Sequence, residues 1–405
     1  MKILIVSSYL PFPLTNGGHI RLFNLIKQLS MMHEITLVCE MRQSQTKEDI
    51  SEIKKYCKQV ITAPRKKQWS IRNIIKSGLS NKSFLVTGHT NDRLRNQIKE
   101  LLVRNTFDVI HVETFYVMHN ILKTRIPLLL VEHNIEYLVY KRFADQSSLL
   151  IRPLLNIDVY KLRKNELDAW KRSSKLIAVS QEEKDEMKKA GVVVVPNGVD
   201  LLSFPFNKPS TKNYHSMARH LSLPEKELLF IGDFKWIQNR DSVQWIIRDI
   251  WPYLLRAVGD EIKIKLRIVG KNIPDNIKKL NTYDSISFDE NAPKETHKIF
   301  KKSDLLLAPI RIGGGTSFKI LEAMASGVPV VTTKRGIKGF EDVNDNHILV
   351  AENTQDIVDK TARLLRDEQL YAHISANARK LIEDKYNWEA IARRLDAVYH
   401  TLKVK

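Results

Sequence analysis

The sequence contains very little cysteine. Only Cys39 and Cys57 occur among 405 residues, and neither belongs to a CxxC pair or a Cys/His cluster. So few thiols argue against a disulfide framework or a zinc site and favour a reducing compartment. No two aspartates stand two residues apart, so a D-x-D metal clamp is absent, as are the GxxxxGK[ST], HExxH and GxSxG motifs. We therefore expect no bound metal.

Long apolar runs are also absent, and no stretch approaches the length of a membrane span. The start, "MKILIVSSYLPFPLTNGG", places a lysine before a short apolar run, as a signal peptide does. No small-residue cleavage site follows, and Pro11, Pro13 and the Gly17–Gly18 pair fit a strand-to-loop exit better. The sequence thus predicts a cytoplasmic protein that is peripheral, at most, on the inner face of the membrane.

Acidic residues are outnumbered, because 65 Lys and Arg stand against 46 Asp and Glu and give a net charge of +19. This excess favours polyanionic partners such as nucleic acid, acidic lipid headgroups or a phosphorylated substrate. A generally basic, solvated surface is the simpler alternative. The basic runs "SEIKKYCKQ", "PRKKQWSIRNIIK" and "YKLRKNELDAWKR" lack interleaved aromatic residues and any recognisable nucleic-acid module. A nucleic-acid-binding protein is therefore disfavoured.

Short apolar runs alternate with amphipathic stretches along the chain. The first half contains "KILIVSS", "EITLVCE", "QVITAP", "FDVIHVE", "IPLLLVEH", "SKLIAVS" and "GVVVVPNG", and the second half "ELLFIGDF", "IKLRIVG", "SISF", "SDLLLAPI", "VPVVTT" and "HILVAE". Runs nearly continuous in Ile, Leu and Val are typical of strands buried on both faces. The pattern predicts an α/β protein of two facing Rossmann-like, doubly wound domains with an interdomain cleft, where ligands of such sheets bind.

A polar, proline-punctuated segment separates the two halves. We assign residues 1–200 to an N-terminal domain, 201–225 to a linker and 226–385 to a C-terminal domain. Residues 386–405 are predicted to form an amphipathic helix that packs back toward the N-terminal domain.

The stretch "RIGGGTSFKILEAMASGVPVV", residues 311–331, combines a glycine loop with a helix. The backbone of Gly313, Gly314 and Gly315 can approach a ligand closely, and Thr316 or Ser317 can cap a helix whose amino end suits phosphate. Lys319 can add a charge, and Glu322 can accept hydrogen bonds from sugar hydroxyls. The alternative is a flexible turn with an ordinary i,i+3 Lys–Glu surface pair.

Several motifs in register resemble the group 1 glycosyltransferases (glycosyltransferase family 4), which have the GT-B fold. They are "NGGHIRLFNLIKQL", "FDVIHVE", "LLLVEHNIEY", "LIAVSQEEKDEM", "VVVVPNGVD", "FIGDFKWIQNRDSVQW", "ILEAMASGVPVV" and "YNWEAIARRL". The resemblance implies a retaining, metal-independent transferase that needs no cofactor and uses a nucleotide-diphosphate sugar as co-substrate. It places the nucleotide sugar in the C-terminal domain and the acceptor mainly in the N-terminal domain.

The chain departs from the family pattern at two places. The acidic residue usual eight positions before Glu322 is Gly314, and the usual basic pair falls on Asp233 and Gln238. Neither of these is cationic.

A variant subgroup with a GGGT-x-x-K loop offers an explanation. Lys235, with the W-x-x-N of Trp236 and Asn239, resembles that subgroup. In this interpretation Lys319, with Lys235 or Arg311 nearby, replaces the missing cations. The alternative is a degenerate enzyme that has lost donor chemistry.

Candidate residues of the N-terminal domain follow predicted strands. His133 ends "IPLLLVEH", and the family places a histidine there beside the anomeric centre; we assign it a catalytic role with Lys319 and Glu322. Gly17 and Gly18 are assigned to donor binding, with Lys235 and the loop residues Gly313 to Ser317. Possible acceptor contacts are Arg21, His111, Glu113 and Glu136.

The combined prediction is transfer of a sugar to a glycan or polyprenyl-phosphate-linked acceptor in polysaccharide or glycoconjugate biosynthesis, next to an anionic membrane surface. The alternatives are a nucleotide-sugar epimerase on the same fold and a nucleic-acid-binding protein.

Overall fold

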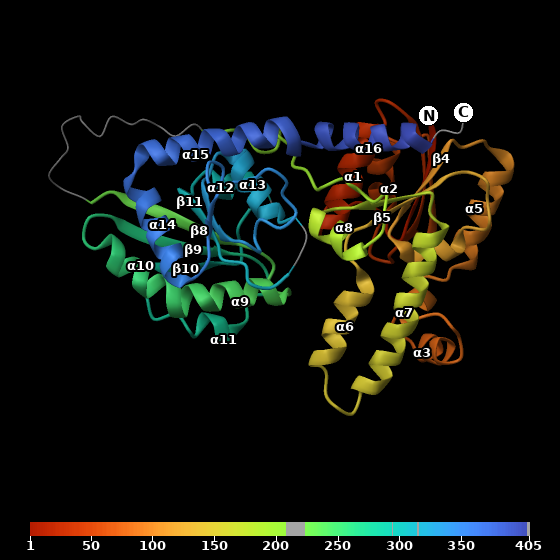
Figure 1. The fold of residues 1–405 in the computed structure, drawn as a ribbon, viewed down its shortest axis with the longest axis horizontal. Coiled ribbons are helices and arrows are strands. Elements are labelled where there is room, and N and C mark those ends of the chain that lie inside the picture. The colour runs from red at the N-terminus through yellow and green to blue at the C-terminus, as the bar shows by residue number, and fades with distance from the viewer. Residues whose placement is uncertain (208–222, 294, 314–315, 403–405) are drawn as a thin grey trace. The chain divides into compact units, whose positions relative to one another are not determined.

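A computed structural model describes residues 1–207, 223–293, 295–313 and 316–402 of the chain. The chain divides into two compact units, shown in Figure 1. Unit 1 comprises Met1–Pro196 and Trp388–Lys405, and unit 2 comprises Asn197–Asn387. Each unit is described by itself below.

Unit 1 is built on a parallel sheet of seven strands in the order β3-β2-β1-β4-β5-β6-β7. The strands are β1 Lys2–Ser7, β2 Glu34–Met41, β3 Gln59–Pro64, β4 Val109–Glu113, β5 Leu128–Glu132, β6 Lys175–Ala178 and β7 Val193–Val194. The order reverses beside β1, which pairs with both β2 and β4. Ligands of open parallel sheets bind beyond the carboxyl ends of strands at such a reversal.

Helices surround this sheet. They are α1 Gly17–Leu29, α2 Lys47–Lys54, α3 Ile71–Gly78, α4 Phe84–Gly88, α5 Asp92–Arg104, η1 Phe115–Asn120, α6 Glu136–Gln146, α7 Arg152–Arg172, α8 Gln181–Met187 and α16 Trp388–Leu402. The last helix lies beside the sheet and α1, where Asp396 Oδ1 is 2.9 Å from His33 Nε2.

Unit 2 has a parallel sheet of six strands in the order β10-β9-β8-β11-β12-β13. These are β8 Glu225–Ile231, β9 Lys263–Val269, β10 Ile286–Asp289, β11 Leu305–Ala308, β12 Val330–Thr333 and β13 Leu349–Ala351. Its helices are α9 Ile237–Trp245, η2 Ile246–Ile250, α10 Trp251–Val258, α11 Asp275–Lys278, α12 His297–Phe300, α13 Phe318–Ser326, α14 Thr354–Arg366, α15 Glu368–Leu381 and η3 Ile382–Tyr386.

The predicted α/β architecture is confirmed. Every apolar run chosen from the sequence becomes a strand, and the central ones are wholly buried: Ile3 to Val6 and Leu305 to Ala308 are 0% exposed. Helices cover both faces of these sheets, so strand residues on either side must be apolar. This explains why the runs are continuous rather than alternating.

The junction between the units differs from the predicted boundaries. Residues 197–207, placed in the N-terminal domain and linker, pack within unit 2. The backbone N–H of Val199 donates to the Tyr386 carbonyl (2.8 Å), and that of Asn207 donates to the Ser326 carbonyl (3.0 Å). Phe204 is buried beside them. Apolar side chains and paired backbone groups anchor this segment, which its polar, proline-containing composition did not indicate. The rest of the predicted linker, residues 208–222, lies outside the described residues.

Among the described helices, none combines the length and the apolar character that crossing a membrane requires.

Candidate active site

The glycine loop leaves the carboxyl end of β11 and enters α13 in unit 2. Gly313 has φ +115°, a conformation that side chains strongly disfavour. Arg335 Nη1 donates to the Gly313 carbonyl (2.7 Å) and holds this turn. Gly314 and Gly315 lie outside the described residues. The Arg335 hydrogen bond fixes the start of the loop. Position 313 requires glycine because its φ is positive.

The start of α13 differs from the expected capping. Ser317 occupies the N-cap position without a side-chain capping bond, so it does not cap the helix as predicted. Thr316 is buried, and its hydroxyl donates to the Gly339 carbonyl (3.2 Å). With no side-chain cap, amide groups of the first turn stay available, as an anion-binding helix end requires.

Lys319 points inward from the first turn of α13. Its Nζ donates to Asn239 Oδ1 (2.8 Å) and lies 4.2 Å from the centre of the Phe230 ring. Burial lowers the pKa of Lys319 to about 7, although Glu322 opposes the shift. The side chain is therefore held by residues of β8 and α9, which is unlike the solvated i,i+3 pair considered as the alternative.

Glu322 lies one turn further along α13 and is half-buried. Burial raises its pKa to about 7, while a hydrogen bond with Thr296 and the charge of Lys319 act in the opposite direction. A lysine and a glutamate whose pKa values burial shifts toward neutral pH, one turn apart on the same helix, are typical of a ligand site.

Asn239 connects the W-x-x-N motif to the glycine loop. Besides accepting from Lys319, it donates through Nδ2 to the Asp233 carbonyl (2.7 Å). Its amide group packs so closely on Gly232 that a Cβ there would lie 2.7 Å away. Asn239 was noticed only as part of a motif. Its proximity to Lys319 required the tertiary structure, because 80 residues separate the two.

The candidate replacement cations differ in their surroundings. Arg311 is paired with Asp241 at 2.7 and 3.1 Å and lies over the Trp245 ring. Lys235 is exposed, and its backbone N–H donates to Asp233 Oδ1. Arg335, which was not selected from the sequence, is half-buried at the loop. A lone Arg in "VTTKRGIKG" after a predicted strand was the available signal. Asp233 and Gln238 stand where the family usually has cations, as the sequence shows.

In unit 1, His133 follows β5 directly, as expected. Its Nε2 lies 2.5 Å from Glu113 Oε1, and the other oxygen of Glu113 lies 2.8 Å from His111 Nε2. His111 Nδ1 is in turn 2.6 Å from the Tyr399 hydroxyl on α16. The four side chains form one hydrogen-bonded chain from α16 to the carboxyl end of β5. Of its members, His133 alone has an exposed side chain, at 20%.

This chain changes the roles of two predicted acceptor contacts. His111 and Glu113 are both 0% exposed, so neither offers an atom to an acceptor, contrary to the sequence-based assignment. Burial acts to raise the pKa of Glu113, but the charge of His133 and the hydrogen bonds from both histidines outweigh it. The pKa therefore lies well below its usual range. Glu113 stays ionised and orients His133.

Arg21 also differs from its assignment as an acceptor contact. Its side chain is 1% exposed, and it donates to the carbonyls of Pro196 (2.7 Å) and Val195 (2.8 Å). Arg21 thereby ties α1 to the segment that follows β7. Gly17 and Gly18 open α1, as expected, after an Asn16 N-cap that accepts from the His19 N–H. Tyr9 hydroxyl donates to the Gly18 carbonyl (3.3 Å).

Glu136 is the first residue of α6 and is half-buried. Burial raises its pKa, against a hydrogen bond with Tyr116 and the charge of His133. Its backbone N–H and that of Tyr137 donate to the two oxygens of Glu166 (2.9 Å each), a buried carboxylate that caps α6. Glu136 is thus a predicted acceptor contact that lies near His133 and is only partly buried.

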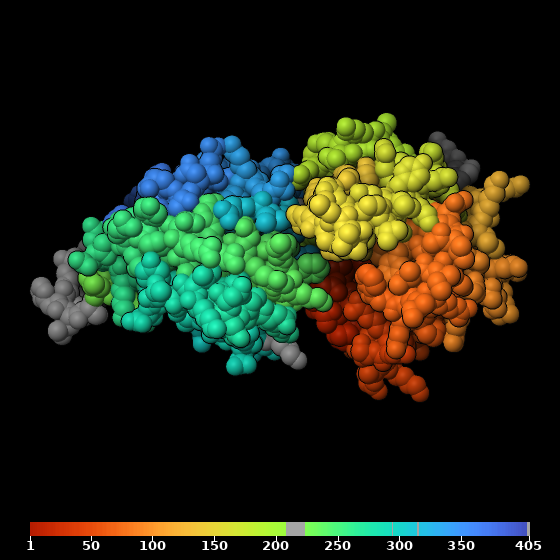
Figure 2. All heavy atoms as spheres, turned by 90° about the horizontal axis from the view of Figure 1, so that it is seen from below, coloured from red at the N-terminus to blue at the C-terminus, as the bar shows by residue number. Residues whose placement is uncertain are grey.

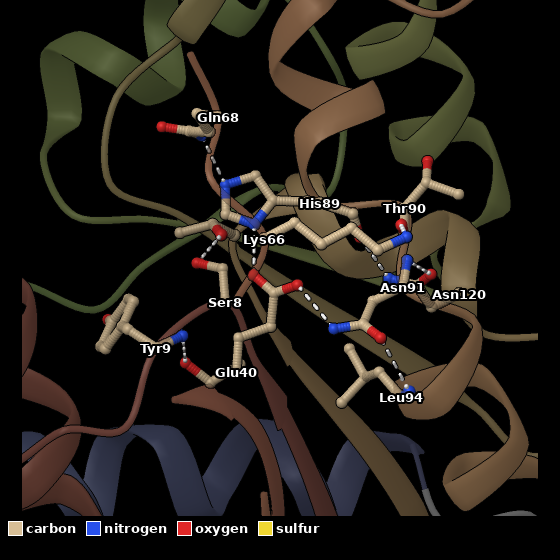
Figure 3. A network of polar contacts seen from close by, with 12 residues as sticks. Ser8, Tyr9, Glu40, Lys66, Gln68, His89, Thr90, Asn91, Leu94 and Asn120 are labelled. Atoms are coloured by element: carbon tan, nitrogen blue, oxygen red, sulfur yellow. Dashed lines mark hydrogen bonds and ion pairs between the residues drawn. The ribbon is translucent and has the colours of Figure 1, made fainter. Parts of the chain in front are cut away.

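A second buried network fixes the strand end beside this region (Figure 3). His89 Nδ1 lies 2.6 Å from Glu40 Oε2, its Nε2 lies 3.1 Å from the Gln68 amide, and Asn91 donates to Glu40 Oε1 (3.3 Å). Lys66 donates to the Thr90 carbonyl (2.7 Å). These bonds tie the segment after β3 to the end of β2, and nothing in the sequence pattern indicated them.

Two further arginines follow the neighbouring strands β2 and β3. Met41 and Pro64 are paired in register, so Arg42 and Arg65 leave the sheet side by side. Burial, together with the charge of Arg42, lowers the pKa of Arg65. Burial likewise lowers the pKa of His19, against a hydrogen bond to the Pro13 carbonyl, and both arginines add to the lowering. Two arginines therefore lie at the carboxyl ends of β2 and β3, where they can meet an anionic group, although the carboxylate of Glu40 also acts on Arg65. Their positions directly after two predicted strands were the sequence signal that was missed.

Within the described ranges, no group of three or more His, Cys, Asp and Glu side chains is arranged to hold a metal ion.

Comparison with known protein families gives two matches. A family described as "Glycosyltransferase Family 4" matches residues 15–202, and one described as "Glycosyl transferases group 1" matches residues 225–367.

Curated relatives include an uncharacterized 44.6 kDa protein in the cps region of Klebsiella pneumoniae. It is 22% identical over 400 residues, covering 95% of this chain and 96% of its own. The lipopolysaccharide 1,2-N-acetylglucosaminetransferase of Salmonella typhimurium is 25% identical over 221 residues, 51% of this chain and 56% of its own.

Solved structures share the fold. Sucrose-phosphate synthase from Thermosynechococcus elongatus has a TM-score of 0.66 at 15% identity and covers 99% of both chains. Anabaena HepE in complex with UDP and glucose has a TM-score of 0.62 at 15% identity, over 99% of this chain and 100% of its own.

Proposed function

This chain belongs to the group 1 glycosyltransferases, which are enzymes of GT-B fold, and we propose that it is a retaining, metal-independent member acting in the synthesis of a polysaccharide or glycoconjugate. It transfers a sugar from a nucleotide diphosphate to a glycan or polyprenyl-phosphate-linked acceptor. The observation that carries the proposal is the inward Lys319, which Asn239 holds beside an uncapped helix end and the positive-φ turn at Gly313.

The donor's charged end fits unit 2. The first-turn amides of α13 and Lys319 hold the diphosphate, while Glu322 accepts hydrogen bonds from paired hydroxyls of the donor. Arg335 beside Gly313, with the exposed Lys235, supplies the cations that Asp233 and Gln238 do not. A UDP-linked sugar is the first donor to test, because the related HepE structure contains UDP and glucose.

The proposed reaction breaks the bond between the anomeric carbon and the diphosphate oxygen. Lys319 and the helix amides stabilise the charge that develops on this leaving oxygen. The acceptor hydroxyl attacks the same face, and the departing phosphate oxygen takes its proton, so the new glycosidic bond retains the configuration. No metal takes part in this scheme. His133, which Glu113 orients, is the side chain of unit 1 to which we assign the proposed catalytic role.

Unit 1 is proposed to bind the acceptor. The two arginines after β2 and β3, Arg42 and Arg65, support an anionic acceptor such as a lipid-linked phosphate, and Glu136 supports a polar contact nearby. An anionic membrane surface at the inner face of the cell membrane is the proposed place of action. An epimerase is not favoured, since the relatives from Salmonella typhimurium and Rhizobium meliloti are named as an N-acetylglucosaminetransferase and a mannosyltransferase. Incubation of the donor alone should leave its sugar unchanged.

Thermal-shift measurements with UDP-, GDP-, ADP- and dTDP-linked sugars test the donor site. The true donor should raise the melting temperature by ligand linkage. Glu322→Ala should weaken donor binding and Lys319→Ala should lower turnover, each by roughly tenfold or more, because a hydrogen bond to a charged group is worth about 1.5–3 kcal/mol.

The matched control is the exposed pair Glu295 and Lys298, which has the same i,i+3 spacing on another segment of unit 2. Alanine at either control position should change neither binding nor turnover. If Glu322→Ala and Lys319→Ala both kept full activity, the assignment of the donor site would be wrong.

A further inference from the structure

Helix α3 of unit 1 has its polar and apolar sides reversed. Its polar residues Asn73 and Ser77 are buried, whereas Ile71, Ile74 and Ile75 are 78%, 53% and 55% exposed. A helix that meets only water places its apolar stripe against the core, so this arrangement needs another partner for the isoleucines.

Hydrogen bonds fix the reversed orientation. Asn73 Nδ2 donates to the carbonyls of Lys67 (2.9 Å) and Gln68 (3.0 Å). Ser77 Oγ donates to Asp158 Oδ1 of α7 (3.3 Å), and Lys161 Nζ donates to the Ser77 carbonyl (2.7 Å). Rolling the helix to hide its isoleucines would break these bonds.

The helix pair α6–α7 continues the same kind of surface. Figure 1 shows this pair projecting from unit 1, with α3 beside α7. At its turn, Leu149 and Leu150 are 81% and 90% exposed, and Leu154 follows at 70%. More than half of the exposed large apolar side chains of the described residues belong to these segments: Trp69, Ile71, Ile74, Ile75, Leu79, Val139, Phe143, Leu149, Leu150, Ile151, Leu154, Ile157 and Tyr160. We call this set the apolar surface.

Basic residues outnumber acidic ones in the segments that form the apolar surface. Residues 65–91 contain six Lys and Arg (Arg65, Lys66, Lys67, Arg72, Lys76 and Lys82) and no Asp or Glu. On the hairpin, Asp145 is already paired with Lys141 and Arg152, and Asp158 faces α3. Figure 2 looks onto this face, with the hairpin in yellow and the α3 region in orange.

We propose that the apolar surface, formed by α3 and the α6–α7 hairpin, docks on the surface of an anionic phospholipid membrane. Exposed Leu, Ile and Trp side chains insert at the boundary between headgroups and acyl chains, while lysines and arginines around them meet lipid phosphates. A second copy of this chain is a poorer occupant, since it would bring a similarly basic surface against this one. This inference rests on the proposed function, in which the acceptor is lipid-linked, and it assigns the membrane contact to named segments of unit 1.

Sedimentation of the full chain with vesicles tests the proposal. The protein should bind vesicles containing phosphatidylglycerol and remain free with phosphatidylcholine alone. A hairpin variant (Leu149→Ser, Leu150→Ser, Leu154→Ser) and a charge variant (Lys67→Gln, Arg72→Gln, Lys76→Gln) should each lower vesicle affinity by about tenfold or more.

Matched controls lie elsewhere in unit 1. Met31 and Val103 are 71% and 78% exposed, so Met31→Ser with Val103→Ser removes comparable apolar side chains. Replacing the exposed Arg93, Lys99 and Arg104 of α5 by glutamine removes the same number of charges. Both control variants should bind vesicles as the unchanged protein does.

Two results would overturn the proposal: full vesicle binding by both variants, or equal binding to neutral and anionic vesicles. A variant-sensitive dimer in the absence of lipid would instead assign the surface to a second copy. Donor binding, measured without vesicles, should stay unchanged in all variants. Failure of the proposed function would appear as no donor binding or transfer, whatever the vesicles show.

Discussion

At Lys319, burial opposes ionisation at the position where the proposed mechanism needs a positive charge. The structure resolves this by bringing Asn239, the Phe230 ring and Glu322 close to the ammonium group. A phosphate that binds there would favour the charged form further. Lys319 and Glu322 therefore connect donor binding to pH.

We predict a bell-shaped pH dependence of donor affinity with its maximum near pH 7. Lys319 must be protonated, and its pKa is lowered to about 7, so affinity falls as pH rises above this value. Glu322 must be ionised, and its pKa is raised to about 7, so affinity falls as pH drops below it. Calorimetric titration with the donor nucleotide across this range measures the curve.

Single variants separate the two limbs. Lys319→Gln should abolish the alkaline limb, and Glu322→Gln the acidic limb, on top of their weaker binding. Unchanged limbs in both variants would mean that other groups set the pH dependence.

Among secondary structure elements, α16 has an effect beyond its own packing. Tyr399 on this helix begins the hydrogen-bonded chain through His111 and Glu113 to His133. The helix thus contributes to the orientation of a candidate catalytic side chain that lies elsewhere on unit 1.

Tyr399→Phe tests this contribution. Loss of the hydroxyl leaves the buried Nδ1 of His111 without its hydrogen-bond partner, which should cost about 1–3 kcal/mol of stability. Without this bond His111 and Glu113 hold His133 less firmly, so the turnover number of transfer should fall while the KM for the donor stays unchanged.

The split between the turnover number and KM separates a positioning role from a stabilising one. Tyr160→Phe, an exposed tyrosine on α7, is the control and should leave both quantities unchanged. A loss of stability with an unchanged turnover number would show that Tyr399 only supports the fold.

At the scale of the whole molecule, donor chemistry is assigned to unit 2 and α16 packs within unit 1. Leu395 of α16 is 0% exposed, so Leu395→Ala should destabilise unit 1 by about 2–5 kcal/mol through lost packing and a cavity. Scanning calorimetry should show a lower melting temperature for the unfolding transition of unit 1 only. The donor nucleotide should still raise the melting temperature of the other.

Arg393 on the same helix is largely exposed and serves as the control, because an exposed ion pair such as Arg393–Glu389 contributes little. If the donor nucleotide no longer raised the melting temperature of the unit 2 transition in Leu395→Ala, the assignment of the donor to unit 2 would be contradicted.

The sequence determined both sheets. Short apolar runs marked all thirteen strands found among the described residues. Most are nearly continuous in Ile, Leu and Val because both faces are buried, whereas β9 alternates charged and apolar residues. The sequence also predicted the glycine loop and the helix that follows it with Lys319 in its first turn, because these are local features. Family motifs added the nature of the reaction.

Only the tertiary structure decided which of the candidate side chains are open. Arg21, His111 and Glu113 follow sequence patterns like those of accessible residues, yet partners 175 and 288 residues away bury Arg21 and His111. The orientation of α3 depends in the same way on α7, 81 residues further along. Periodicity fixes which local element forms. Burial and hydrogen-bond partners come from contacts between distant segments, and these set the roles of the charged residues.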